Sequence, residues 1–245
     1  MPREDIANDL GRKHRVSEAK AAIELSQSEP EVGRIALVSS FGADSAVLLH
    51  LAARVSQDIP VLFLDTGKHF EETLSYQRDL AVQLGLRDLR VIKPDAQNLR
   101  EQDPYGALHT HAPDACCDLR KTQPLHEALT GFDGWITGRK RHQSQSRAAL
   151  KVFESDAASG RLKINPLAHW SMADIADYMR TNALLAHPLI ARGFLSIGCA
   201  PCTSATAQGE DPRSGRWRGT DKAECGIHFN DKAHQRATTT QGTAT

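Results

Sequence analysis

The feature that most constrains the fold is a repeated alternation of short apolar runs and helical segments between residues 34 and 94. The runs RIALVSS, IPVLFLDTG and LRVIKP have the length and the β-branched content of buried strands. SAVLLHLAARVSQ and HFEETLSYQRDLAVQLG, which lie between them, carry apolar residues at helical spacing, and the second ends at Gly85, a typical C-cap. This alternation predicts an α/β fold, with a mostly parallel twisted sheet and helices on both faces.

Later segments extend the pattern. GWIT predicts a strand that runs into the basic loop GRKRHQSQSR, and LKINPLAHW predicts another short strand. SMADIADYMRTN predicts a helix start, because Ser171 and Asp174 have the spacing of a capping box. The polar N-terminal stretch is expected to be helical, whereas RATTTQGTAT near the end has too little apolar content to fold. We expect an N-terminal helical segment at residues 1–33 and an α/β domain that carries the binding sites at residues 34–202. A mobile tail is expected at residues 203–230 and a disordered end at residues 231–245.

The charge balance excludes some classes of protein. Thirty basic residues offset thirty acidic ones, which argues against a nucleic-acid coat or a membrane-surface protein. The start MPREDIANDLGRKHR lacks the apolar core of a secretory signal, and runs such as AVLLHLAA are too short to span a bilayer. We therefore expect a cytoplasmic protein without nucleic-acid or membrane partners. In that compartment clustered cysteines indicate metal or redox chemistry more often than disulfides.

Two turns at predicted strand ends suggest a ligand site. SSFGADS joins the first strand to its helix, where backbone N–H groups and the helix dipole attract anions. It lacks the Gly-Lys-Ser/Thr of a Walker A loop, and a plain turn without a ligand is the simpler alternative. LDTG ends the second strand, and ligands of open parallel sheets bind beyond such ends. Together the turns predict a bound nucleotide. The candidate residues are Ser40, Phe41, Gly42, Ser45, Asp65, Thr66 and Gly67.

Four of the five cysteines form two close pairs. Cys116 and Cys117 are adjacent, in a segment predicted to be helical up to Pro124, and Cys199 and Cys202 have C-x-x-C spacing. A C-x-x-C alone fits a redox pair, half a zinc site or half an iron–sulfur site. The two pairs together supply four thiols for one metal centre. An adjacent Cys-Cys fits the spaced knuckles of zinc sites poorly, so the pattern favours an iron–sulfur cluster.

The fifth cysteine stands in KAECGIHF, near the C-terminus. Cys225 has Lys222 and His228 three residues away on either side, with Arg213 and Arg216 upstream. Positive neighbours lower the pKa of a thiol, and the thiolate is the nucleophilic form. Cys225 is therefore a candidate catalytic residue, although this segment taken alone favours a stray thiol.

A set of ordered motifs now makes the chain resemble a known family. The resemblance rests on the order of six motifs along the chain: SSFGADSAVLLHL, LDTG, CCDLRK, SIGCAPCT, GRWRG and ECGIH. The chain resembles assimilatory adenylylsulfate (APS) reductases of the thioredoxin-dependent bacterial type, within the PAPS reductase family. The resemblance covers residues 34 to 229 and implies an adenine-nucleotide α-hydrolase-like sheet. It further implies a 4Fe-4S cluster as cofactor. The implied cluster ligands are Cys116, Cys117, Cys199 and Cys202.

The resemblance also implies a reaction. Cys225 would attack the sulfur of APS, release AMP and keep a cysteine S-sulfonate, from which thioredoxin or glutaredoxin would release sulfite. This would serve sulfate assimilation and cysteine biosynthesis. The electrons would come from thiols, so the implied role of the cluster is electrostatic and structural.

Three positions stand out against related loop patterns. SSFGADS resembles the Ser-Gly-Gly-x-Asp-Ser pyrophosphate loop of ATP pyrophosphatases, but Phe41 replaces its first Gly, and the bulk of this side chain is expected to favour a smaller anion, such as a sulfate, over a pyrophosphate. Asp44 is the acidic residue typical of ATP pyrophosphatases, which could hold Mg²⁺. Lys140 replaces an Arg of the loop Gly-x-Arg-Arg-x-Gln-Ser and so loses a bidentate fork.

Basic residues complete the implied site. An anionic nucleophile that attacks an anionic substrate requires nearby positive charge, and Lys121 could link the cluster to the substrate. A solvated surface charge is the alternative for each of these residues. The implied basic contacts are Lys121, Lys140, Arg141, Arg147, Arg213 and Arg216.

Three alternatives stay open at the level of sequence. A reductase for the 3′-phosphorylated substrate PAPS is disfavoured by the four cluster cysteines, whose absence marks that branch. An iron–sulfur tRNA thiolase would need an intact pyrophosphate loop and a basic RNA-binding face. A non-catalytic, zinc-stabilised nucleotide-binding module is the third. The sequence leaves open whether the chain forms a homo-oligomer.

Overall fold

The computed structural model describes residues 3–156, 159–220, 222 and 226–228. In this part of the chain the strands form one six-stranded sheet in the order β3-β2-β1-β4-β6-β5. All neighbouring pairs are parallel except β5 and β6, which confirms the predicted mostly parallel sheet. The strands are β1 Ile35–Ser39, β2 Val61–Leu64, β3 Leu89–Ile92, β4 Gly134–Ile136, β5 Phe153–Ser155 and β6 Leu162–Ile164.

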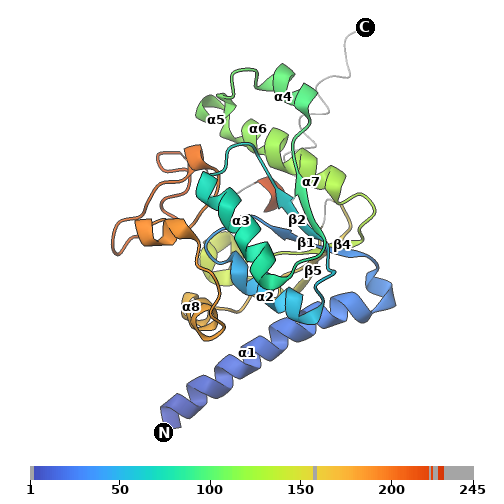
Figure 1. Ribbon diagram of the computed structural model, residues 1–245, viewed down its shortest axis with the longest axis vertical. Helices are drawn as coiled ribbons and strands as arrows, with labels where there is room; N and C mark the ends of the chain where they lie inside the picture. The colour runs from blue at the N-terminus through green and yellow to red at the C-terminus, as the bar shows by residue number, and fades with distance from the viewer. Residues whose placement is uncertain (1–2, 157–158, 221, 223–225, 229–245) are drawn as a thin grey trace.

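Helices cover both faces of the sheet, as expected. Alternate residues of β1 face opposite sides, so Ile35 and Leu37 pack with the helices α1, α2, α3 and α8, whereas Ala36 and Val38 pack with α7. Figure 1 shows α1 extending beyond the body of the domain at its N-terminal end. The helices are α1 Arg3–Ser28, α2 Ser45–Val55, α3 Glu71–Leu84, α4 Ala96–Gln102, α5 Leu108–His111, α6 Pro113–Cys117, α7 Gln123–Ala128 and α8 Met172–Thr181.

Local sequence signals explain several boundaries. Gly85 ends α3 with a φ of 65°, the left-handed conformation that glycine adopts without strain. The capping box at the start of α8 is present: the Ser171 hydroxyl accepts from the Asp174 N–H at 3.1 Å, and the Asp174 carboxylate accepts from the Ser171 N–H at 2.8 Å. Both predictions are confirmed.

The segment after the cysteine pair is helical for longer than predicted. A π-helical turn, Asp118–Thr122, joins α6 to α7, and the helix continues past Pro124 to Ala128. Pro124 lies in the first turn of α7, where its missing N–H costs little. The proline therefore does not end the helix, which corrects the predicted boundary.

The edge strand β5 was not predicted. It has only three residues, Phe153 and Ser155 are exposed, and the segment carries no apolar alternation. Its antiparallel pairing with β6 forms instead through the turn around Gly160, whose N–H donates to the Asp156 carbonyl at 2.8 Å.

The segment that follows the C-x-x-C lies against the body up to residue 220. Thr203 and Arg216 form an isolated antiparallel bridge, the Ser204 N–H donates to the Gly215 carbonyl at 2.8 Å, and Trp217 is buried. The expected division at residues 33, 202 and 230 stays a prediction, and residues 229–245 lie outside the described part of the chain. No described helix is both long enough and apolar enough to cross a membrane.

Candidate active site

A cleft of about 910 Å³ opens at the carboxyl ends of β1, β2 and β4, where ligands of open parallel sheets bind. One part of its wall is basic. It is formed by the loop that follows β4 and by the segment around Arg216, which pairs with Thr203. A second stretch of wall, formed by α8 and the residues after it, is mainly apolar. The predicted site residues that line the cleft are Ser40, Gly42, Ser45, Lys121, Lys140, Arg147, Arg213 and Arg216.

Phe41 does not face this cleft. Its backbone has a φ of 47°, its side chain is fully buried, and its ring lies edge-on to Phe63 with centroids 5.4 Å apart. A left-handed φ costs a non-glycine residue about 1–2 kcal/mol, and burial of the large ring in the core offsets this cost. The expectation that the bulk of Phe41 narrows the anion site is therefore corrected.

The turn after β2 faces the cysteines rather than the cleft. The Thr66 hydroxyl lies 3.3 Å from the sulfur of Cys199, and the Asp65 carboxylate accepts from the Gly67 N–H at 3.0 Å. The three predicted residues Asp65, Thr66 and Gly67 are absent from the described lining of the cleft. Through Thr66 this turn contacts the cysteine region.

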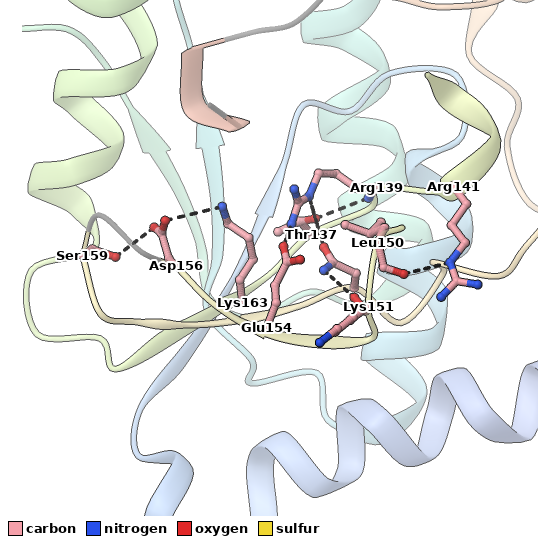
Figure 2. A network of polar contacts seen from close by, with 10 residues as sticks. Thr137, Arg139, Arg141, Leu150, Lys151, Glu154, Asp156, Ser159 and Lys163 are labelled. Carbon is pink, nitrogen blue, oxygen red and sulfur yellow. Dashed lines mark hydrogen bonds and ion pairs between the residues drawn. The ribbon is translucent and has the colours of Figure 1, made fainter. Parts of the chain in front are cut away.

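The basic loop after β4 presents a different arginine from the one expected. Arg141 is exposed and its Nε donates to the Leu150 carbonyl at 2.8 Å, whereas Arg139 is buried and lines the cleft. The Nε of Arg139 donates to Asn165 at 3.2 Å, and its guanidinium pairs with Glu154 of β5. Figure 2 shows Arg139 between Thr137 and Glu154 in this polar network. Sequence reasoning missed Arg139, because it occupies the variable position of the loop pattern.

Lys140 is the most deeply buried basic residue of this wall. Only 1% of the residue is exposed. Its ammonium lies 3.1 Å from the Asp44 carboxylate and donates to the Gly138 carbonyl at 3.1 Å. Asp44, which was expected to be able to hold Mg²⁺, is thus paired with a protein cation.

The four paired cysteines come together. Cys116 and Cys117 from α6, and Cys199 and Cys202 from the C-x-x-C turn, line one small pocket next to the cleft. The other described residues that line this pocket are Lys68, His109, Pro113, Arg120, Lys121, Pro201, Arg216 and Trp217. Lys121 and Arg216 line both spaces, so they stand where the cleft meets the cysteine pocket.

A buried ion pair supports this pocket. Arg120 donates to Asp103 at 2.7 Å and to the Thr66 carbonyl at 2.9 Å, and it is 8% exposed at its side chain. The Arg120 guanidinium therefore ties the π-helical turn to the end of β2 and to the loop before α5.

The cysteine pocket has a mixed electrostatic environment. Burial raises the pKa of the Cys116 and Cys202 thiols above the usual value. Arg120 opposes this rise at Cys116, and Lys121 and Arg216 oppose it at Cys202. No three His, Cys, Asp or Glu side chains in the described ranges are arranged as ligands of a single metal ion. The donor set, four thiols with cationic neighbours, still fits a centre that binds thiolates.

Cys225 lies outside the described residues, but residues on both sides of it are described. Lys222 pairs with Asp114 and lies 5.7 Å from the centre of the Trp217 ring. Ile227 lines the cleft and packs against the α7 side of the core. Lys222 therefore lies next to α6 and Trp217, beside the cysteine pocket, and Ile227 lies at the cleft.

Further lining residues carried no signal in the sequence. Trp135 lies within β4, Thr137 directly follows it, and His69 lies between β2 and α3; that they line the cleft depends on the fold. The apolar wall could have been anticipated only as one face of the predicted helix that starts at Ser171. Its residues include Ile175, Met179, Leu184, Ile190 and Leu195.

Comparison with known proteins agrees with this geometry. The family model of the phosphoadenosine phosphosulfate reductase domain matches residues 34–205. An adenosine 5'-phosphosulfate reductase of Mesorhizobium japonicum is 56% identical over 208 residues, which cover 85% of this chain and 81% of the relative. One of Streptomyces coelicolor is 45% identical over 188 residues, covering 76% and 78% of the two chains.

Solved structures share the fold. A phosphoadenylyl-sulfate (PAPS) reductase from Candida auris has a TM-score of 0.65 at 24% identity, over 80% of this chain and 96% of that one. The FMN adenylyltransferase of Candida glabrata has a TM-score of 0.58 at 15% identity, over 95% and 84% of the two chains. The predicted adenine-nucleotide α-hydrolase-like fold is confirmed. The chain belongs to the phosphoadenosine phosphosulfate reductase domain family and is an oxidoreductase that acts on sulfur.

Proposed function

We propose that the chain reduces adenylylsulfate to sulfite and AMP, with thioredoxin as the reductant. The observation that carries this proposal is the junction of the two spaces: a basic cleft at the strand ends opens beside a pocket of four cysteines, and Lys121 and Arg216 line both. Relatives that are 45–56% identical are named adenosine 5'-phosphosulfate reductase, which supports APS as the substrate.

The basic residues would neutralise the phosphosulfate. The first turn of α2, which begins at Ser45, would offer the backbone N–H groups of a helix N-terminus to an anion. A side chain at Gly42 would come within 3.1 Å of the Ile197 carbonyl, so glycine allows the loop its close approach to that segment. Arg213 and Arg216 on the opposite wall would stabilise the charge that develops during attack.

The chemistry would take place at Cys225. Its thiolate attacks the sulfate sulfur, the bond from sulfur to the bridging oxygen breaks, and AMP leaves with the electron pair. A thiolate of thioredoxin then attacks the sulfur of Cys225, and sulfite leaves with the electrons of the S–S bond. The second thioredoxin thiol releases Cys225 as a thiolate. The two electrons thus come from the thiols of thioredoxin, which indicates a reducing compartment such as the cytoplasm.

Cys116, Cys117, Cys199 and Cys202 would hold the 4Fe-4S cluster that the family resemblance implies. Bound there, the cluster would supply a fixed charge next to Lys121 and a covalent tie between α6 and the C-x-x-C turn. Arg120 would support this region through its ion pair with Asp103.

The direct test is sulfite release from APS and from PAPS by anaerobically purified protein with reduced thioredoxin. The proposal expects kcat/KM to be much higher for APS. Comparable or higher kcat/KM for PAPS would assign the chain to the 3′-phosphorylated substrate, and zero sulfite from both would refute the proposed reaction.

A further inference from the structure

His69 is a half-buried histidine of the cleft to which the proposed reaction gives no role. It follows the turn after β2 and lines the cleft. Its Nε2 lies 2.8 Å from the Leu64 carbonyl oxygen. A carbonyl oxygen can only accept a hydrogen bond, so Nε2 carries the proton and Nδ1 carries a lone pair. Nδ1 is buried and has no hydrogen-bond partner among the described residues.

The ring of His69 is held in this orientation. It stacks on Phe63 with centroids 5.0 Å apart and an interplanar angle of 32°, and Phe63 in turn packs against Phe41. Rotation of the imidazole by half a turn would exchange each nitrogen with a ring carbon and break the hydrogen bond to Leu64. The unusual Phe41, which the sequence placed in an anion loop, thus supports the position of His69 from within the core.

The electrostatic surroundings favour the neutral imidazole. Burial lowers the pKa of His69 below its usual value, and the nearby ammonium of Lys121 acts in the same direction. The hydrogen bond to Leu64 and the carboxylate of Asp65 oppose this shift without reversing it. A neutral Nδ1 lone pair repels phosphate and sulfate oxygens, so His69 marks a part of the cleft that suits a neutral donor.

We propose that Nδ1 of His69 accepts a hydrogen bond from the nucleoside part of the substrate, and that it helps to select adenosine nucleotides. This inference rests on the proposed function. At neutral pH an adenosine nucleotide offers N–H or O–H donors only at the 6-amino group and at the ribose hydroxyls. A buried acceptor that has no partner in the described part of the chain is satisfied when such a donor enters. An analogue that lacks the donor leaves Nδ1 unpaired, which is the basis of discrimination.

Binding of four nucleotides tests the proposal and locates the donor. Calorimetry measures the affinity of the wild type for AMP, for IMP (whose 6-oxo group accepts instead of donating), for 2′-deoxy-AMP and for 3′-deoxy-AMP. One of the three analogues is expected to bind about five- to tenfold more weakly than AMP, as one net hydrogen bond predicts. IMP as the weak binder identifies the 6-amino group, and a deoxy analogue identifies a ribose hydroxyl.

Two substitutions distinguish the roles of the two ring nitrogens of His69. His69→Gln places an amide N–H near the position of Nε2 and removes the acceptor at Nδ1, whereas His69→Asn keeps an acceptor near Nδ1. His69→Gln is expected to bind AMP about five- to tenfold more weakly and to treat AMP and the weak analogue alike. His69→Asn is expected to keep most of the discrimination. Thermal unfolding of both variants shows that they are folded.

The outcomes distinguish this inference from the proposed function. AMP affinity and discrimination that are unchanged in His69→Gln overturn the inference and leave the proposed function intact. A uniform loss for all four nucleotides in His69→Gln also overturns it, because His69 would then position another group, such as Lys121. If the wild type binds no AMP, the proposed function itself fails.

Discussion

At the scale of single residues, the ion pair of Lys140 and Asp44 shows how a buried positive charge is stabilised in the wall of the cleft. A buried ammonium requires a partner, and the Lys140 side chain is 2% exposed while that of Asp44 is 40% exposed. The pair sits at the start of α2, where an anion would bind. The carboxylate thus keeps a buried cation at the anion site, in place of the metal role that the sequence suggested for Asp44.

Asp44→Asn is therefore expected to lower the free energy of unfolding by about 1–3 kcal/mol, because it leaves the Lys140 ammonium without its counter-charge. Urea unfolding measures this loss. The matched control is Asp58→Asn, in an ion pair with Arg87 whose side chains are 67% and 65% exposed, where a change within about 0.5 kcal/mol is expected. Equal losses in the two variants would contradict the assigned role of the Asp44 carboxylate.

At the scale of elements, the short helix Pro188–Arg192 is capped by a buried histidine. The Leu189 N–H donates to Nδ1 of His187 at 3.2 Å, so Nε2 carries the proton and donates to the Thr73 hydroxyl at 3.0 Å. This arrangement joins the segment after α8 to α3 only while the imidazole is neutral. Burial accordingly lowers the pKa of His187 to about 4, with Glu72 opposing the shift.

This pKa shift predicts a pH dependence of stability. An unfolded histidine binds a proton below pH ~6.5, whereas folded His187 stays neutral down to about pH 4. The unfolded state therefore binds more protons between these values, and the free energy of unfolding falls as the pH falls from ~6.5 to 4, by about 2 kcal/mol. Above this window His187 contributes no pH dependence.

His187→Asn keeps an acceptor and a donor but cannot titrate, so its urea-unfolding curve should lose less stability than wild type between pH 6.5 and 4. His169→Asn, at an exposed histidine, is the control and should follow the wild type. Identical pH dependence in His187→Asn and wild type would show that the capping histidine does not titrate as described.

The meeting of α6 with the C-x-x-C turn leads to a prediction about the metal content of the protein. α6 and the C-x-x-C turn are far apart in the chain but line one pocket. Anaerobically purified protein should be brown and contain iron and acid-labile sulfide, and Cys117→Ser should lose most of both, because one of the four implied ligands is gone. Stoichiometric zinc without labile sulfide would contradict the proposed cluster.

At the scale of the whole molecule, much of the fold followed from the sequence, and the details of the site did not. The parallel sheet was predictable because strand and helix periodicities alternate strongly along the first strands. The edge strand β5 and the packing of residues 203–220 depend on contacts that no local pattern records. In the loop after β4, Arg139 and Lys140 line the cleft, whereas Arg141, the first residue of a 3₁₀ turn at Arg141–Gln143, does not.

The same limit applies to the catalytic centre. The four cysteines could be grouped from spacing and resemblance, and the structure brings them to one pocket. The roles of Phe41 and His69 could not be predicted, because the burial of one ring nitrogen and the direction of one aromatic ring depend on neighbours from other elements. The walls of the cleft come from segments that are far apart in the chain: the loop after β1, α8 and the segment around Arg216.

The central claim is that sulfur passes from APS to Cys225. The most direct measurement is mass spectrometry of wild type and Cys225→Ser after incubation with sulfur-labelled APS in the absence of reductant. Wild type should carry one labelled SO₃ group on the peptide that contains Cys225 and release it as sulfite when reduced thioredoxin is added. Cys225→Ser should still bind AMP but carry no label and produce no sulfite. Label on another cysteine, or thioredoxin-dependent sulfite production by Cys225→Ser, would contradict the account.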